Sequence, residues 1–166
     1  MAVVDSASGS SDTGLFYEIL NYEFDRASRY NNAVTLMFIK FDQLNEIGRN
    51  YGQLAVSRII WEVERLIRDN IRRADRGFVY GQDEFMIILP NTPKEGANRM
   101  IPKLKQLIEH HLLASGRGAH ISPQFGIASY PHDVRTGNGV VNFPAISSDA
   151  KAAQVVAGGP AVQAQR

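Results

Sequence analysis

Apolar residues recur along much of this chain at the spacing of amphipathic helices. The pattern predicts helices over residues 15–30, 53–71 and about 94–113, each with one apolar face that would pack on a core. Asp12 and Thr13 precede the first of these helices, and either side chain is suited to cap its unpaired N–H groups. We therefore expect at least three helices, joined by strands and polar turns.

Runs of apolar residues between the helices predict strands. Residues 34–41 are apolar at both odd and even positions, as in a central strand that is covered on both faces. Two shorter runs, residues 78–80 and 85–89, flank a polar turn and predict a hairpin. A further strand is expected over residues 119–129.

Composition narrows the class of protein. The 166 residues are 44% hydrophobic, which suits one domain with a sizeable core. There are no cysteines, so disulfides and thiolate metal sites are excluded. A net charge of +1 gives no general attraction to nucleic acid or to an anionic membrane, and no segment approaches the ~18 apolar residues of a membrane span. We expect a cytoplasmic protein without a nucleic-acid partner and without membrane insertion.

The turn of the predicted hairpin carries the most specific motif in the chain. Its five residues are Gly81, Gln82, Asp83, Glu84 and Phe85. The motif and its setting resemble the signature of the GGDEF domain family, the diguanylate cyclases that condense two GTP molecules into cyclic di-GMP. Further landmarks of that family match in the same order: residues 34–41, Tyr51, Gly52, Pro90 and residues 126–131.

The resemblance implies an α/β (α+β) fold of the nucleotidyl-cyclase palm type. A central mixed sheet would be flanked by helices, with residues 81–85 on a β-hairpin. The resemblance covers residues 14–133, which would form a degenerate GGDEF domain. Residues 1–13 are expected to be a flexible N-terminus. Residues 134–166, rich in Gly, Ala and Ser, are expected to be a degraded C-terminal part of the domain and a disordered tail.

Several positions differ from what the resemblance implies for catalysis. Lys40 aligns with a metal-binding carboxylate, and an ammonium there reverses the charge and removes an oxygen ligand for magnesium. Gly48 and Ser57 align with guanine-binding side chains, and Gln82 replaces a glycine of the signature. Asp83 aligns with the other metal carboxylate, although acidic residues at a hairpin tip are also ordinary solvated turn residues. We therefore expect a catalytically inactive member of the family, with no catalytic residue, no metal and no cofactor.

One ligand site of the family has counterparts in this chain. Arg72 and Asp75 match the R-x-x-D motif of the family's inhibitory product site. An arginine can donate to guanine O6 and N7 or to a phosphate, and an aspartate can accept from guanine N1 and N2. Lys103 aligns with a basic residue that completes the site. Two alternatives remain: an arginine at a helix C-terminus complements the helix dipole, and Arg72 and Asp75 could simply pair with each other.

These residues support three hypotheses. The first is a non-catalytic cyclic di-GMP receptor that uses Arg72 and Asp75 and passes the signal to a partner protein or to a second copy of the domain. The alternative is a protein-interaction scaffold, a pseudoenzyme that binds no nucleotide, and the third is a residual cyclase. If Lys40 stands where the resemblance implies a metal carboxylate, we expect its ammonium to be held by Asp42, by Asp83 or by both.

Overall fold

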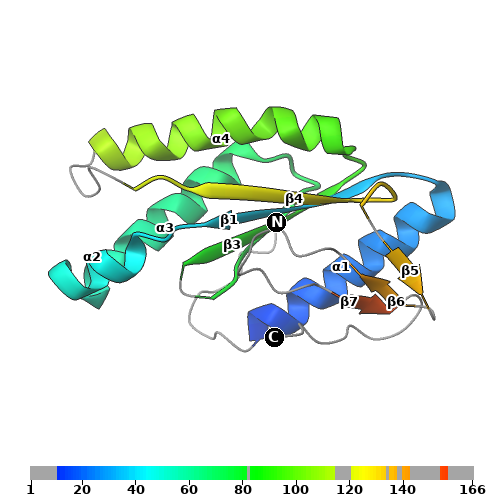
Figure 1. The fold of residues 1–166 in the computed structure, drawn as a ribbon, viewed down its shortest axis with the longest axis horizontal. Coiled ribbons are helices and arrows are strands. Elements are labelled where there is room, and N and C mark those ends of the chain that lie inside the picture. Colours follow the sequence, from blue (N-terminus) through cyan, green and yellow to red (C-terminus); the bar gives the residue numbers. More distant parts are fainter. Residues whose placement is uncertain are drawn as a thin grey trace.

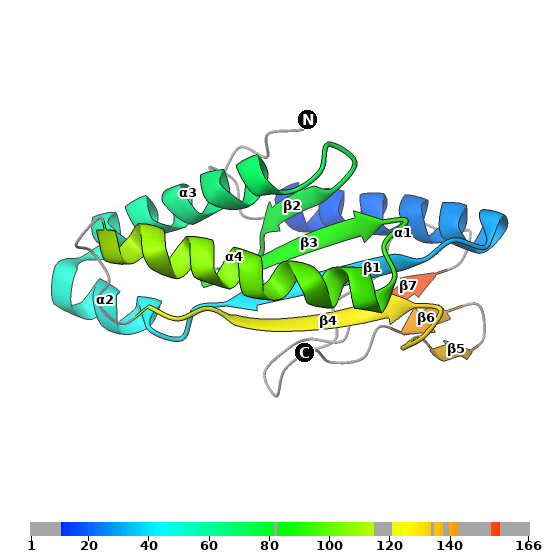
Figure 2. The same ribbon diagram turned by 90° about the horizontal axis from the view of Figure 1, so that it is seen from above.

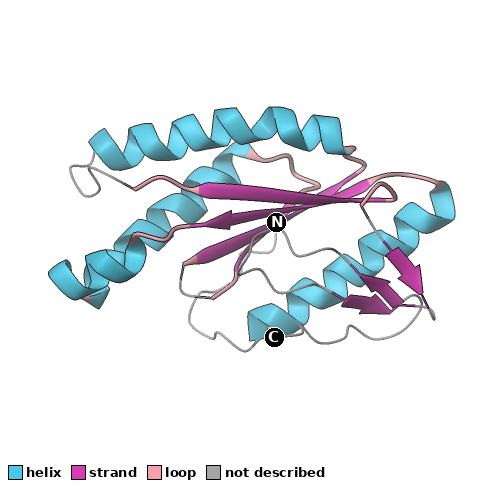
Figure 3. Cartoon of the chain, viewed as in Figure 1, coloured by secondary structure: helices cyan, strands magenta, loops and turns pink. Residues whose placement is uncertain are grey.

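The computed structural model describes residues 11–81, 83–114, 121–133, 135–137, 140–142 and 154–156. Its elements, in chain order, are α1 (Ser11–Tyr30), β1 (Val34–Lys40), α2 (Leu44–Tyr51), α3 (Gln53–Asn70), β2 (Arg76–Val79), β3 (Glu84–Pro90), α4 (Lys94–Ala114), β4 (Gln124–Tyr130), β5 (Arg135–Gly137), β6 (Val140–Asn142) and β7 (Gln154–Val156). Figures 1 and 3 show one main sheet with helices on both of its faces.

The main sheet has four strands in the order β2-β3-β1-β4, and every neighbouring pair is antiparallel. Helix α1 packs on one face, where its core cluster includes Leu36 and Phe38 of β1. Helices α3 and α4 cover the other face, where the core includes Met37 and Ile39 (Figure 2). Successive side chains of β1 thus enter opposite cores, which confirms the prediction of a central strand covered on both faces.

The predicted α/β (α+β) palm-type fold, with helices flanking a central sheet, is confirmed. The described strands of this sheet are antiparallel throughout. The hairpin forms from β2 and β3, and the Tyr80 N–H donates to the Glu84 carbonyl at 2.7 Å to close its turn. Strand β4 begins after Pro123, later than predicted, because proline has no N–H to donate to a ladder.

A helix that the apolar pattern does not predict, α2, precedes the expected helix over residues 53–71. Gly52 separates the two: its φ is 86°, its N–H donates to the Gly48 carbonyl at 3.0 Å, and α3 starts at the next residue. Glycine makes such a corner without steric cost. Helix α1 begins at Ser11, so Asp12 and Thr13 lie in its first turn and do not precede it as caps.

The predictions for the two ends of the chain fall largely outside the described residues, namely residues 1–10 and most of residues 134–166. Within the second range, β5, β6 and β7 form a separate three-stranded antiparallel sheet. None of the helices that the structure describes is long and apolar enough to span a membrane.

Candidate functional site

A tight turn joins α3 to the edge strand β2. Helix α3 ends at Asn70, and Ile71 is extended, with φ −103° and ψ 161°. The Asp75 N–H then donates to the Arg72 carbonyl at 3.0 Å, and β2 begins at the next residue. This closure brings the Arg72 and Asp75 side chains together, and residues 72–75 are termed the Arg72 turn below.

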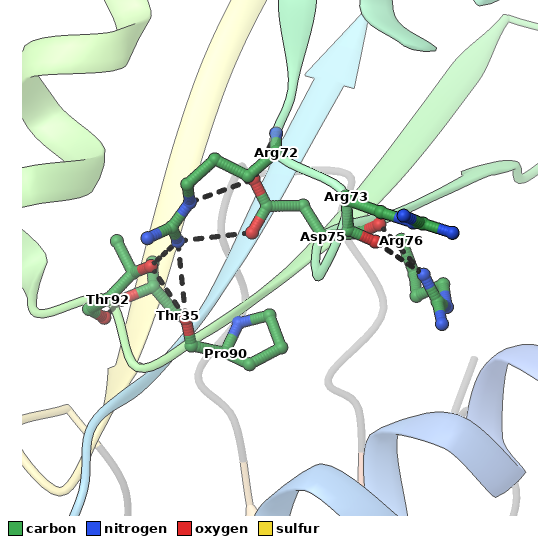
Figure 4. Close-up of polar contacts among 7 residues, drawn as sticks. All are labelled: Thr35, Arg72, Arg73, Asp75, Arg76, Pro90 and Thr92. Carbon is green, nitrogen blue, oxygen red and sulfur yellow. Dashed lines mark hydrogen bonds and ion pairs between the residues drawn. The ribbon is translucent and has the colours of Figure 1, made fainter. Parts of the chain in front are cut away.

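Asp75 is completely buried inside the Arg72 turn. Its Oδ2 atom accepts hydrogen bonds from the Arg72 backbone N–H at 2.8 Å and from Arg72 Nε at 3.3 Å. Its Oδ1 atom accepts from Arg72 Nη2 at 3.1 Å (Figure 4). A buried carboxylate needs such partners, because an unpaired charge in the interior is costly. The two residues of the R-x-x-D motif therefore bind each other in this structure.

Arg72 is held along one edge only. Its Nη2 atom also donates to the Pro90 carbonyl at 3.2 Å and to the Thr92 hydroxyl. Yet 57% of the Arg72 side chain is exposed, and Nη1 has no hydrogen-bond partner among the residues drawn in Figure 4. An arginine with one edge fixed and the other facing solvent can donate to an anion or a base without reorganising.

Sequence reasoning did not single out Thr92 as part of this site. Thr92 lies 20 residues after Arg72 in the chain, and Asn91, with φ 50°, bends the backbone just before it. The sequence does contain a signal, because a threonine followed by Pro93 is typical of a helix start, here that of α4. Nothing in that local pattern shows that the end of α3 lies beside it.

The other cationic residues near the motif, Arg73, Arg76 and Lys103, share no hydrogen bond or ion pair with the Arg72 side chain in the described part of the structure. Arg76 Nη1 donates to the Arg73 carbonyl at 2.9 Å and to the Asp75 carbonyl at 3.5 Å. Figure 4 shows Arg73 and Arg76 on the opposite side of the turn from Arg72. Lys103 is exposed on α4, and within the described residues no hydrogen bond or ion pair links it to Arg72 or Asp75. The structure thus brings two of the three predicted ligand residues together.

A second polar cluster, termed the strand-end cluster, lies where β3, β1 and β4 meet and consists of Lys40, Asp42, Asp83, Glu84 and Gln124. In the sheet register, Lys40 stands between Glu84 and Gln124. Lys40 Nζ lies 3.8 Å from Asp42 Oδ1, and the Lys40 side chain is only 16% exposed. Gln124 Nε2 donates to Asp42 Oδ2 at 2.7 Å. The Lys40 ammonium was predicted to be held by Asp42, by Asp83 or by both, and the structure confirms an ion pair with Asp42.

Asp83 belongs to the same edge through its backbone, because its carbonyl accepts from the Phe41 N–H at 2.9 Å. Gln82 lies outside the described residues. In the part of the chain that the structure describes, no group of three or more histidine, cysteine, aspartate or glutamate side chains could hold a metal ion. Because magnesium takes oxygen ligands and Lys40 presents an ammonium here, the described residues of the cluster do not fit a Mg²⁺ ion.

A hollow of about 400 Å³ lies at the junction of α2 and α3. Its lining residues are Leu44, Asn45, Gly48, Arg49, Gln53 and Val56. A Cβ added at Gly48 would lie 3.3 Å from Val56 Cγ2 and 3.7 Å from Gln53 Oε1. Gly48, one of the two positions at which the resemblance implies a guanine-binding side chain, thus lines the hollow. Ser57, the other such position, donates its hydroxyl to the Gln53 carbonyl of its own helix at 3.1 Å.

Comparison with known proteins agrees with the motif. Residues 2–143 match the family model described as "Diguanylate cyclase, GGDEF domain". Diguanylate cyclase A of Treponema denticola is 23% identical over 121 residues, which cover 72% of this chain and 33% of that protein. The chain spans 24% to 48% of the length of the first curated relatives that it matches.

Two solved structures share the fold. The GGDEF domain of DgcB from Caulobacter crescentus, in complex with c-di-GMP, is 17% identical, with a TM-score of 0.63 and 69% of each chain covered. The active GGEEF domain of a diguanylate cyclase from Vibrio cholerae is 21% identical, with a TM-score of 0.59, and the match covers 72% of this chain and 74% of that chain.

These matches correct the expectation that the chain is not an enzyme. The curated relatives include proteins named diguanylate cyclases, and the fold is shared with an active cyclase domain. The comparisons therefore point to an enzyme family and not to inactivity, so the expectation is wrong. It rested on single aligned positions such as Lys40 and Gly48, whereas the family match extends over residues 2–143.

Proposed function

Since this chain belongs to the GGDEF domain family of diguanylate cyclases, we propose that it works in cyclic di-GMP signalling and binds that dinucleotide at the Arg72 turn. The bound state is passed on to a partner protein or to a second copy of the domain, in the cytoplasm. The observation that carries the proposal is Arg72 itself, whose side chain is 57% exposed although the buried Asp75 pairs with it.

Cyclic di-GMP offers the groups that such an arginine binds. It carries two phosphate anions, and each of its two guanines has O6 and N7 acceptors that match the paired donors of an arginine. Arg72 is already held by Asp75 and Thr92, so little side-chain entropy is lost on binding. The DgcB domain, which shares this fold, was solved with c-di-GMP, and this supports the choice of ligand.

Lys103 is proposed as a second cation for the same ligand. It is exposed on α4, and an ammonium binds phosphate as a point charge without the planar geometry of an arginine. Because no contact links Lys103 to Arg72, it would meet a different part of the dinucleotide or a second dinucleotide molecule. Its loss should therefore weaken binding less than the loss of Arg72.

Isothermal titration calorimetry with the 166-residue chain tests the proposal. Cyclic di-GMP should bind with a Kd below ~50 µM, and Arg72→Ala should abolish the heat of binding. Arg58→Ala, which removes an exposed arginine from α3 outside the site, is the matched control and should leave the Kd unchanged. Equal binding by the Arg72→Ala variant, or no heat with the unmodified chain, would rule out this site.

A second candidate function is the activity of the matched family, the condensation of two GTP molecules into cyclic di-GMP. The family match favours it, and the motif residues Asp83 and Glu84 stand in the strand-end cluster. Incubation with GTP and Mg²⁺, followed by chromatography, tests it. A product that disappears in Asp83→Ala would establish synthesis, whereas no product would leave binding at the Arg72 turn as the function.

A further inference from the structure

We infer that Asp75 holds Arg72 and does not contact the ligand, so that the Arg72 turn recognises acceptor groups only: guanine O6 and N7 or phosphate oxygens. This inference rests on the proposed binding of cyclic di-GMP at the same turn. It assigns the two residues of the R-x-x-D motif different tasks, with Arg72 as the contact residue and Asp75 as a positioning residue.

The first reason is that neither carboxylate oxygen of Asp75 is accessible to a ligand. Its side chain is 0% exposed, so a nucleobase cannot reach it while the turn is closed. Oδ2 already accepts from two Arg72 donors and Oδ1 accepts from a third. The N1–H and N2–H groups of a guanine would have to displace the Arg72 guanidinium in order to bind this carboxylate.

The second reason is the donor count of Arg72. A guanidinium carries five N–H donors, one on Nε and two on each terminal nitrogen. Nε donates to Asp75, and the Nη2 hydrogens serve Asp75, Pro90 and Thr92. Nη1, turned away from these partners in Figure 4, is left with two hydrogens for a ligand. The two Nη1 hydrogens can form hydrogen bonds only with acceptor groups of a ligand.

The third reason is a buried chain of hydroxyl groups that supports Thr92 from the sheet. Thr35 of β1 donates its hydroxyl to the Thr92 carbonyl at 2.7 Å, and the Thr35 and Ser129 hydroxyls are 2.6 Å apart. The Thr92 hydroxyl donates to the Pro90 carbonyl at 2.9 Å. All three hydroxyl-bearing residues are buried. Thr92 is therefore a second positioning residue, fixed by β1 and β4, which fixes Arg72 in turn.

A comparison of two dinucleotides tests the inference by calorimetry. Cyclic di-IMP lacks the guanine 2-amino group but keeps O6 and N7. We expect it to bind within about twofold of cyclic di-GMP, because no acceptor meets the 2-amino group. If Asp75 contacted the base edge, a charge-assisted hydrogen bond would be lost, and affinity would fall at least about tenfold. The inference would be overturned if cyclic di-IMP bound the unmodified chain at least about tenfold more weakly than cyclic di-GMP and this difference disappeared in the Asp75→Asn variant.

Cyclic di-AMP separates the two sources of acceptors. It replaces the O6 acceptor of guanine with an amino group but keeps both phosphates. A large loss of affinity assigns the Nη1 hydrogens to guanine O6 and N7, and an unchanged affinity assigns them to phosphate. An unchanged affinity supports recognition by acceptors alone. Because adenine also lacks the N1–H donor of guanine, a large loss supports it only if the loss is equally large in Asp75→Asn.

Thr92→Val tests whether the support of the Arg72 side chain affects affinity without changing any residue that contacts the ligand. It removes the hydroxyl that Arg72 donates to and leaves Asp75 and every ligand-facing atom in place. We expect a fivefold to tenfold weaker affinity for cyclic di-GMP and cyclic di-IMP alike. An unchanged affinity would show that Arg72 needs no such support. This variant also covers the case in which Asp75→Asn fails to fold.

A ligand-free measurement distinguishes failure of the inference from failure of the proposed function. In ¹⁵N NMR spectra, the Nε–H of Arg72 should exchange with water at least tenfold more slowly than that of Arg58, which is exposed on α3, because Arg72 Nε donates to the buried Asp75. Equal exchange in the unmodified chain would overturn the holding role of Asp75 even if cyclic di-GMP binds. Slow exchange without any binding would refute only the proposed function.

Discussion

Replacing Arg72 should destabilise the domain as well as remove ligand binding. Arg72→Ala leaves the buried Asp75 carboxylate with the 2.8 Å bond from the backbone N–H and removes the bonds at 3.3 Å and 3.1 Å. Breaking a buried ion pair costs about 3–5 kcal/mol. Because 57% of the Arg72 side chain is exposed, water can enter the vacated space, and we expect a loss of about 2–3 kcal/mol.

A double-mutant cycle measured by urea unfolding tests this reasoning. The Arg72→Ala, Asp75→Ala double variant leaves no unpaired buried charge. The losses in free energy of unfolding of the two single variants should therefore add up to about 1–2 kcal/mol more than the loss of the double variant. The Arg65–Asp69 pair of α3 is the matched control: its side chains are each 61% exposed and 3.9 Å apart, and its coupling should stay below about 0.5 kcal/mol. A coupling energy between Arg72 and Asp75 that is also below about 0.5 kcal/mol would refute the reasoning.

Four further outcomes are expected. Burial of Asp133 acts to raise its pKa, but hydrogen bonds, the strongest from Lys94, outweigh burial and lower the pKa from 3.8 to about 2. The ionised carboxylate therefore stabilises the fold above pH 3.8, and this stability is lost as the pH falls toward 2. Lys94→Met should lower the free energy of unfolding by about 1 kcal/mol at pH 7 and make Tm fall less steeply as the pH is lowered. An unaltered dependence of Tm on pH would contradict this. Mg²⁺ alone should leave Tm unchanged, because Lys40 already has a carboxylate partner; a rise of several degrees would show that magnesium binds. Gly52→Ala should lower the free energy of unfolding in urea by about 1 kcal/mol. The cost comes from backbone strain at a φ of 86° and not from a clash, because nothing lies within 4 Å of the added Cβ, and an unchanged stability would contradict this strain. Lys103→Ala should raise the calorimetric Kd for cyclic di-GMP about threefold to fivefold, and an unchanged Kd would remove this residue from the site.

The sheet and its main helices could be predicted because burial leaves a periodic trace in the sequence. Residues 34–41 are apolar at both parities because β1 feeds two cores, one under α1 and one under α3 and α4. The corner between α2 and α3 was not predicted, because Gly52 acts there through its backbone and changes no apolar period. Asp12 and Thr13 are good cap residues by type, yet the helix starts before them.

The candidate site was only partly accessible to sequence reasoning. The R-x-x-D motif identifies Arg72 and Asp75, and spacing alone leaves open whether they pair with each other. The structure settles that point, because the turn buries Asp75 completely. Thr92 could not be assigned to the site, because its contact with Arg72 depends on how the start of α4 packs beside the end of α3. Aligned substitutions such as Lys40 were also a poor guide to the family's activity.

The central claim, that cyclic di-GMP binds at the Arg72 turn, is tested most directly by one calorimetric comparison. The unmodified chain and the Arg72→Ala, Asp75→Ala double variant, in which no buried carboxylate is stranded, are each titrated with cyclic di-GMP after circular dichroism shows that both are folded. We expect a saturable heat with a Kd below ~50 µM for the unmodified chain and none for the variant. Equal binding by both proteins, or by neither, would contradict it.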